Sequence, residues 1–119
     1  MRYLCLICYD ERKLEALSKE ERDALAQEAD AYCEELRNGG HYVASDALYS
    51  VSTATTLRIT SGRLSTTDGP FAETKEQLGG FILIEARDLN DAIRLAARIP
   101  PARLGCVEVR PVKEGGCNT

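Results

Sequence analysis

The residues best suited to chemistry lie together in the middle of the chain, where residues 68–75 have the sequence DGPFAETK. Two carboxylates of this segment, Asp68 and Glu73, stand close in sequence to the amine of Lys75. Two carboxylates whose pKa values differ can work as an acid and a base. The same pair can instead hold an amine or, together with water, a divalent cation. We therefore expect this segment to border a ligand pocket, with Asp68 as the first candidate for proton transfer.

The backbone of this segment is expected to form a rigid loop. Gly69 tolerates dihedral angles that other residues avoid, while Pro70 fixes its own φ and lacks an N–H donor. Phe71 would anchor the loop through its apolar ring, and Glu73 would begin a short helical turn that continues over residues 74–77. The predicted ligand-binding residues are Asp68, Gly69, Pro70, Phe71, Glu73 and Lys75.

A purely structural role is the alternative at the same positions. An aspartate before Gly-Pro often accepts backbone N–H bonds within its own turn, and a glutamate at a helix start can act as a cap. Lys75 and its neighbour Glu76 are then ordinary solvated surface. The sequence leaves both roles open for Asp68 and Glu73.

Outside this segment the reactive side chains are scattered. His41 is the only histidine and the only side chain whose ordinary pKa lies near neutrality, so it is a third catalytic candidate. The five cysteines are an odd number spread along the chain, which favours reduced thiols over a disulfide framework. Cys5, Cys8 and Cys106 are expected to be small buried residues. No metal site is predicted, because ligands are too few, and no cofactor, because the glycines lack a phosphate-binding spacing.

The composition excludes several classes of protein. The chain has 119 residues, a net charge of −4 and a pI near 5.0, so it offers no basic surface for nucleic acid. No apolar segment approaches the ~20 residues needed to cross a bilayer, and the N-terminus lacks a signal-peptide cleavage site. We expect a cytoplasmic protein with one domain over residues 1–113 and a tail over residues 114–119 that frays.

The hydrophobic pattern predicts the elements that position these residues. Expected strands cover residues 3–9, 41–44, 53–60, 63–67, 81–84 and 106–110. A first helix covers residues 19–37, after a capping box formed by Ser18 and Glu21. A second helix follows Asp88 as its cap and ends before Pro100. The residues expected to face the sheet are Leu25, Ala29, Tyr32 and Leu36 in the first helix and Leu89, Ala92, Ile93 and Ala96 in the second.

This order of elements predicts an α+β fold of the ferredoxin-like type, in which an antiparallel sheet carries two helices on one face and the chain contains an inserted β-hairpin. The other face of the sheet, lined by residues 3–9 and 81–84, needs a cover of its own. A second copy of the chain is the simplest cover, so we expect a homodimer.

Residues 68–81, with the sequence DGPFAETKEQLGGF, resemble the signature of the DGPF-type members of the YCII-related family. Residues 52–58, 85–92 and 105–112 fit the same family. The resemblance implies a ferredoxin-like fold of the dimeric α+β barrel type and a family largely without an assigned reaction. Some relatives carry a His–Asp pair thought to be catalytic, to which His41 does not correspond. Others are fused or adjacent to sigma factors of the extracytoplasmic-function type.

Three functions follow as expectations. The first is a dimer that binds a small molecule in a pocket between sheet and loop, with Asp68 on its rim. The second is an enzyme that performs acid–base chemistry on a small organic substrate, with Asp68 as proton carrier assisted by Glu73 or His41. The third is a regulatory partner of a sigma factor, which would bind the exposed face of the hairpin.

Overall fold

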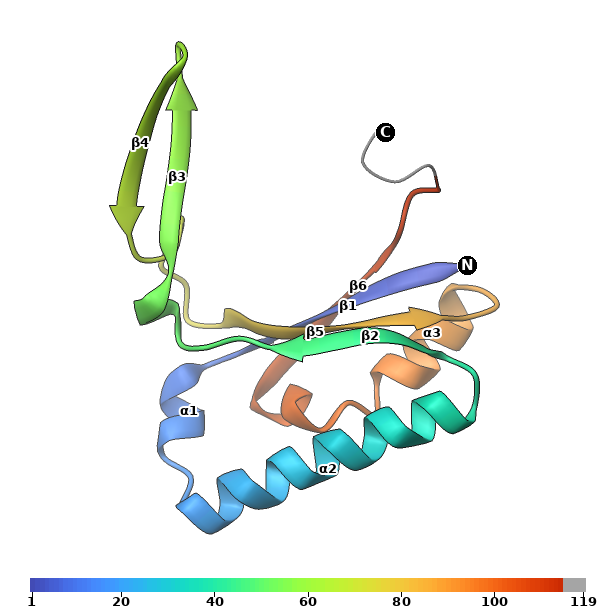
Figure 1. Cartoon of the computed structure of the whole chain (residues 1–119). Helices are drawn as coiled ribbons and strands as arrows, with labels where there is room; N and C mark the ends of the chain where they lie inside the picture. Colours follow the sequence, from blue (N-terminus) through green and yellow to red (C-terminus); the bar gives the residue numbers. More distant parts are fainter. Residues whose placement is uncertain (115–119) are drawn as a thin grey trace.

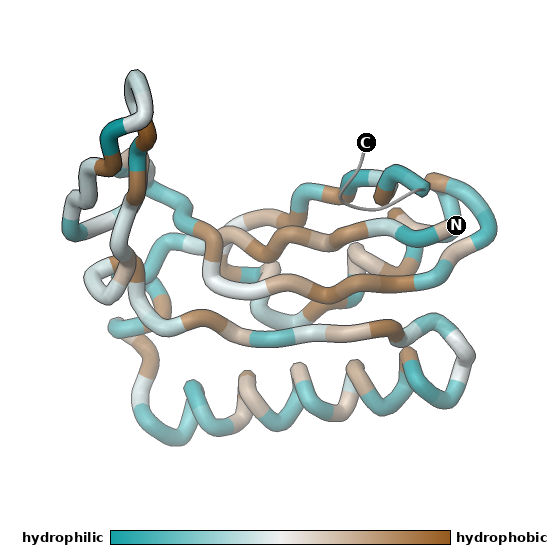
Figure 2. Tube along the Cα trace, turned by 45° about the horizontal axis from the view of Figure 1, so that its top comes forward, coloured by the Kyte–Doolittle hydropathy of each residue, from teal (hydrophilic) through white to brown (hydrophobic). Residues whose placement is uncertain are grey.

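A four-stranded antiparallel sheet forms the centre of the structure, a computed structural model that describes residues 1–114. Its strands are β1 (Arg2–Tyr9), β2 (Tyr42–Ala47), β5 (Gln77–Glu85) and β6 (Gly105–Pro111), in the order β2-β5-β1-β6. The central strands β1 and β5 are the two nearly continuous apolar runs of the sequence, as Figure 2 shows. The sheet and its strand order agree with the predicted ferredoxin-like fold.

Three helices lie on one side of this sheet (Figure 1): α1 (Glu11–Glu15), α2 (Lys19–Asn38) and α3 (Leu89–Ala96). The predicted capping box starts α2, because Ser18 Oγ accepts a hydrogen bond from Glu21 N at 3.1 Å and the Glu21 carboxylate accepts one from Ser18 N at 2.9 Å. Two short 3₁₀ helices, η1 (Val51–Thr53) and η2 (Pro100–Leu104), complete the connections. None of the helices in residues 1–114 is long and apolar enough to cross a membrane.

The core lies between the sheet and the helices α2 and α3. Its largest members come from the inner faces of β1 and β5, from the C-terminal half of α2, and from α3 and the segment that follows it. They are Tyr3, Cys5, Ile7, Ile82, Ile84, Tyr32, Leu36, Leu95 and Ile99. The Tyr32 hydroxyl donates a hydrogen bond of 2.5 Å to the Leu95 carbonyl, which joins α2 to α3.

The apolar stripe predicted for α3 is wrong in part. Ala92 and Ala96 are buried as expected, but Leu89 and Ile93 are each 50% exposed. The buried face instead includes Asp91, whose carboxylate accepts hydrogen bonds from Arg87 N and from the Arg94 guanidinium. These hydrogen bonds turn the polar Asp91 inward and the apolar Leu89 and Ile93 outward.

No helix of residues 1–114 covers the opposite face of the sheet, which we call the open sheet face (Figure 1). Its centre is apolar, because Leu6 pairs with Phe81 and Leu4 with Leu83 across β1 and β5. All four side chains are only partly buried. Residues 1–114 thus leave the apolar centre of this face without a covering element.

Two of the three cysteines predicted to be buried lie on this open sheet face. Cys8 and Cys106 stand opposite each other on β1 and β6, and they are half-buried and exposed, respectively. Only Cys5 is fully buried, and burial raises its pKa to about 11. Alternation along β1 explains the difference, since it sends Cys5 and Cys8 to opposite faces.

A separate two-stranded sheet formed by β3 (Thr55–Thr60) and β4 (Arg63–Asp68) projects from the body on the same side as the open sheet face (Figure 1). At its tip Ser61 and Gly62 have φ values of 52° and 75°, as a two-residue type I′ turn requires. Every residue of β4 is exposed. Apart from Glu114, the tail predicted to fray lies outside the described residues.

Candidate functional site

The loop after β4 turns back toward the body at Gly69, whose φ of 103° favours glycine. The Gly69 N–H donates to the Ala54 carbonyl at 2.7 Å. The Thr56 hydroxyl in turn donates to the Gly69 carbonyl at 2.7 Å. The start of the DGPFAETK segment is therefore tied to the base of β3.

The helical turn predicted over residues 74–77 is wrong. The Gln77 amide donates to the Ala72 carbonyl at 3.3 Å and to the Thr74 carbonyl at 3.0 Å, while Thr74 Oγ1 donates to the Glu76 carbonyl at 2.6 Å. Side chains thus satisfy carbonyls that a helix would use for its own backbone N–H groups. The segment forms a side-chain-braced loop, and Gln77 already begins β5.

A polar pocket of about 570 Å³ lies between this loop and α1, and we call it the loop pocket. Four of the six predicted ligand-binding residues line it: Gly69, Pro70, Glu73 and Lys75. The remaining wall comes from the residue after β1, from α1, from η1 and its cap, and from the loop and the start of β5. Those residues are Asp10, Glu11, Arg12, Glu15, Ser50, Val51, Ser52, Thr74 and Gln77.

Two of the predicted ligand-binding residues are not part of this wall. Phe71 is 81% exposed, so its ring does not anchor the loop as expected. Asp68 is an exposed residue at the end of β4, opposite Thr55. The structure therefore places Asp68 beside the loop pocket rather than in it.

His41 lies far from the other candidates. Its Nδ1 is 2.9 Å from the Glu85 carbonyl, at the end of the sheet where β5 finishes. The loop enters β5 at the other end, and the eight steps of that strand from Gln77 to Glu85 span roughly 26 Å at 3.3 Å per residue. His41 and Asp68 are thus not brought together.

Asp10 is the buried acid of the loop pocket, and the sequence analysis missed it. It is 5% exposed and caps α1 by accepting a hydrogen bond of 3.0 Å from Arg12 N. The Arg12 guanidinium contacts both carboxylate oxygens at 3.3 Å. This guanidinium hydrogen bond, helped by the backbone bond and by the charge of Lys75, holds the pKa of Asp10 below its ordinary value. Asp10 is therefore a fixed negative charge rather than a proton donor.

The rest of the wall divides into paired and free charges. The Glu11 carboxylate accepts hydrogen bonds from Ser50 Oγ at 2.8 Å and from Val51 N at 3.0 Å, which fastens α1 to η1. Glu73 and Lys75 are exposed and form no ion pair with any residue of the described chain. Glu15 is likewise exposed and forms no ion pair within residues 1–114, so these three side chains are the ones left free to bind a ligand.

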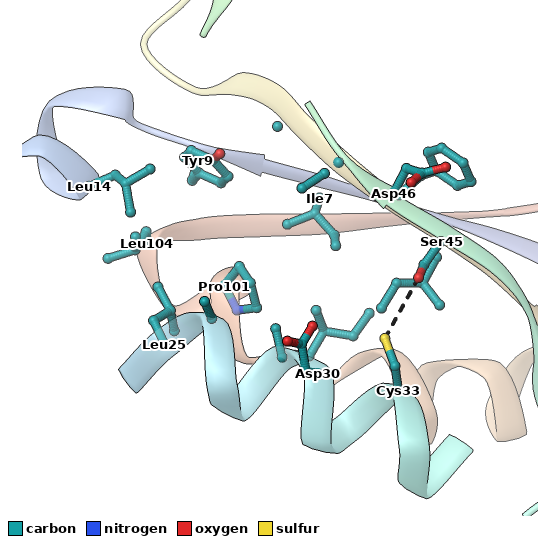
Figure 3. Close-up of a pocket in the computed structure, with 18 of the residues that line it drawn as sticks. Ile7, Tyr9, Leu14, Leu25, Asp30, Cys33, Ser45, Asp46, Pro101 and Leu104 are labelled. Atoms are coloured by element: carbon teal, nitrogen blue, oxygen red, sulfur yellow. Dashed lines mark hydrogen bonds between the residues drawn. The ribbon is translucent and has the colours of Figure 1, made fainter. Parts of the chain in front are cut away.

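A second cavity, of about 400 Å³ and largely apolar, lies between α2 and the sheet (Figure 3). Helix α1 stands between the two spaces, because Leu14 lines this cavity whereas Glu15 lines the loop pocket. Local sequence patterns gave no sign of the cavity, since it depends on how far α2 stands from the sheet.

The model of the YCII-related domain matches residues 1–115. The chain belongs to the YCII-related family. An uncharacterized protein of Rhizobium meliloti (strain 1021) is similar, with 37% identity over 110 residues that cover 90% of this chain and 89% of the relative. The predicted family is thus confirmed.

The residues matched by the family model include those that line the loop pocket and those that line the second cavity. The DGPFAETK segment, the capping residue Asp10 and the apolar lining of the second cavity all lie within the match. Neither the family description nor the relative's name mentions a ligand. The kind of ligand is therefore inferred from the side chains that line each cavity.

Proposed function

We propose that this YCII-related domain, a member of the DGPF type, binds a small polar molecule in the loop pocket. The observation that carries this proposal is the convergence of Gly69, Pro70, Glu73 and Lys75 on one pocket that also contains the buried Asp10. A volume near 570 Å³ falls within the range of ~300–1,000 Å³ that is typical of ligand sites.

The charges of the wall indicate which groups such a molecule carries. Lys75 has no ion-pair partner in residues 1–114 and is suited to an anionic group such as a carboxylate. Glu73 is equally free and is suited to an amine or another hydrogen-bond donor. Arg12 is already neutralised by Asp10 and adds little attraction for an anion. A small molecule with both an amine and a carboxylate fits this arrangement best.

A thermal-shift screen with small amino-carboxylates and their singly charged analogues tests the proposal. A compound that binds only the folded chain adds about 2.7 kcal/mol to the free energy of unfolding at a concentration near 100 times its Kd. The melting temperature therefore rises. We expect Lys75→Met and Glu73→Gln to abolish the shift, and Lys113→Met, which alters an exposed lysine beyond β6, to keep it. Equal loss in all three variants, or no shift with any compound, would contradict the proposal.

We also propose that two copies associate through the open sheet face to form a dimeric α+β barrel. The apolar centre around Leu6 and Phe81 is bordered by charged residues of β6, β1 and β5, including the ion pairs Arg110–Glu108 and Arg2–Glu85. An apolar centre with a polar rim is typical of protein interfaces, and the same patch on both copies satisfies a two-fold axis.

Sedimentation velocity tests this association. The mass obtained from sedimentation should be about twice the monomer mass of 13.1 kDa for the wild-type chain. For Leu6→Glu it should equal the monomer mass. The control Ile93→Glu places the same charge on the exposed side of α3 and should remain dimeric. A monomeric wild type at micromolar concentration would contradict the proposal.

A second candidate function uses the hairpin. Leu57, Ile59 and Leu64 share one face of it and are 60%, 76% and 62% exposed. Exposed apolar side chains grouped in this way mark protein contacts, and we propose a sigma factor of the extracytoplasmic-function type as the partner. Ile59→Lys should weaken binding to such a purified sigma factor at least about tenfold, whereas Lys75→Met should not. Equal binding by the wild type and Ile59→Lys would contradict this candidate.

A further inference from the structure

The N-terminal half of α2 stands away from the sheet. The buried residues of α2, Tyr32 and Leu36, both lie in its C-terminal half. One and two turns earlier, Leu25 and Ala29 continue the same apolar stripe but face the cavity of about 400 Å³ described above, which we call the α2 cavity (Figure 3). The apolar side of the helix is thus directed at a space that no side chain of residues 1–114 fills.

The gap beneath α2 is held open by the chain itself. Helix η2 contacts both α2 and β1, so it acts as a spacer between the helix and the sheet. The ion pairs Arg103–Glu28 and Arg98–Glu35 fasten the η2 region to α2. Because this spacer fixes the distance, α2 cannot simply collapse onto the sheet.

Most of the residues that line the α2 cavity are apolar or glycine. Ser45 Oγ lies 3.7 Å from Cys33 Sγ and 2.8 Å from the Tyr42 hydroxyl, which leaves Ser45 able to exchange a hydrogen bond with a guest. Burial raises the pKa of Tyr9, so the phenol at the other end is neutral. The charged residues in the lining are Arg22 and Asp30 on α2 and Asp46 on β2, and Asp46 pairs with Phe81, so its side chain lies on the open sheet face.

We propose that the α2 cavity is a binding site for an uncharged, mainly apolar molecule that carries one hydroxyl group. The apolar body would lie against Ile7, Leu25 and Ala29, and the hydroxyl would bond to Ser45. This site differs from the loop pocket in position and in chemistry, since α1 separates the two and one is apolar where the other is charged. The proposal does not depend on the function proposed for the loop pocket.

The first test uses 2-naphthol, an apolar two-ring molecule with one hydroxyl, in isothermal titration calorimetry. We expect binding to the wild-type chain and a loss of at least about tenfold in affinity in Ala29→Phe, whose ring occupies the space. The matched control Ala31→Phe adds the same ring on the exposed side of α2 and should bind as the wild type does. Lys75→Met should also bind normally, which separates this site from the loop pocket.

The second test needs no variant and so does not depend on whether Ala29→Phe folds. Cys33 lines the α2 cavity, whereas Cys106 lies on the open sheet face, on the other side of the sheet. Saturating 2-naphthol should slow the alkylation of Cys33 by N-ethylmaleimide at least about fivefold, as followed by mass spectrometry, and leave Cys106 unchanged. Absence of binding, equal binding by Ala29→Phe and the wild type, loss of binding in Lys75→Met, or equal slowing at both cysteines would each overturn the proposal.

Discussion

Asp10 and Asp91 are the buried charged residues of the described chain, and each stabilises the start of a helix. The Asp91 carboxylate accepts a hydrogen bond of 3.0 Å from Arg87 N and one of 2.8 Å from Arg94 Nη2. The Arg87 N–H, followed by the Arg94 guanidinium, holds the pKa of Asp91 well below its ordinary value. Such a carboxylate stabilises the folded chain above the pKa of the unfolded state, and this contribution is lost as the pH falls toward the folded-state pKa.

Asp91→Asn should therefore lower the melting temperature by several degrees at neutral pH. The difference between variant and wild type should shrink below about pH 4, where the unfolded carboxyl becomes protonated and the wild type begins to lose its advantage. Thermal melts across this range provide the measurement, with the exposed Asp23→Asn as control. A difference that stays constant down to low pH would show that the charge of Asp91 is unimportant.

Gly79 is a second residue whose identity is fixed by its surroundings. It is the extra residue of a β-bulge, because Ile7 pairs with Gly80 and Cys8 with Leu78. A Cβ at Gly79 would lie 2.2 Å from the Tyr9 ring.

Gly79→Ala should consequently destabilise the chain by about 1–3 kcal/mol, as overpacking does. Denaturant unfolding measures this loss. In the background of Tyr9→Ala, which removes the obstructing ring, the same substitution should cost much less. Equal costs in both backgrounds would show that the Tyr9 ring is not the cause.

At the scale of elements, the sequence predicts the long and periodic ones best. The capping box at Ser18 and the apolar stripe through Tyr32 and Leu36 defined α2 almost to the residue, and the apolar run at residues 3–9 defined β1. The apolar run at residues 81–84 predicted only the second half of β5, which begins at Gln77. Short elements were not predicted correctly, because a single side-chain hydrogen bond can determine whether a short helix or a turn forms. Asp10 caps α1, a third helix where the sequence predicted only two, and the Gln77 side chain bonds to carbonyls of the turn predicted before β5.

The candidate site shows the same division. The turn chemistry of Gly69 and Pro70 placed the loop, and four of the six predicted residues do line one pocket. Asp10 was missed because its place opposite that loop depends on the packing of β1 beside β5, which no local pattern contains.

The junction between α1 and η1 is a testable element of the loop pocket. Glu11→Gln should weaken the bonds to Ser50 and Val51 and loosen the wall. We expect amide hydrogen exchange at Val51 to become roughly tenfold faster, the factor that corresponds to about 1.4 kcal/mol, which is within the range for such a bond. Glu15→Gln, on the same helix, is the control. Unchanged exchange at Val51 would mean that other contacts hold α1 in place.

The whole molecule combines a one-sided sheet with a projecting hairpin. If a second copy covers the open sheet face, the melting temperature must rise with protein concentration, by mass action. We expect an increase of a few degrees between about 1 and 100 µM for the wild type and none for Leu6→Glu. Scanning calorimetry over this range measures it, and a melting temperature independent of concentration in both proteins would argue against association.

The tip of the hairpin offers a practical opportunity for labelling. Ser61 and Gly62 connect two exposed strands through a turn distant from the sheet, the helices and both cavities. Exposed tips of this kind tolerate foreign sequence well. A short affinity or fluorescent tag inserted between these two residues would report on the chain while leaving the core, the caps and both cavities unaltered.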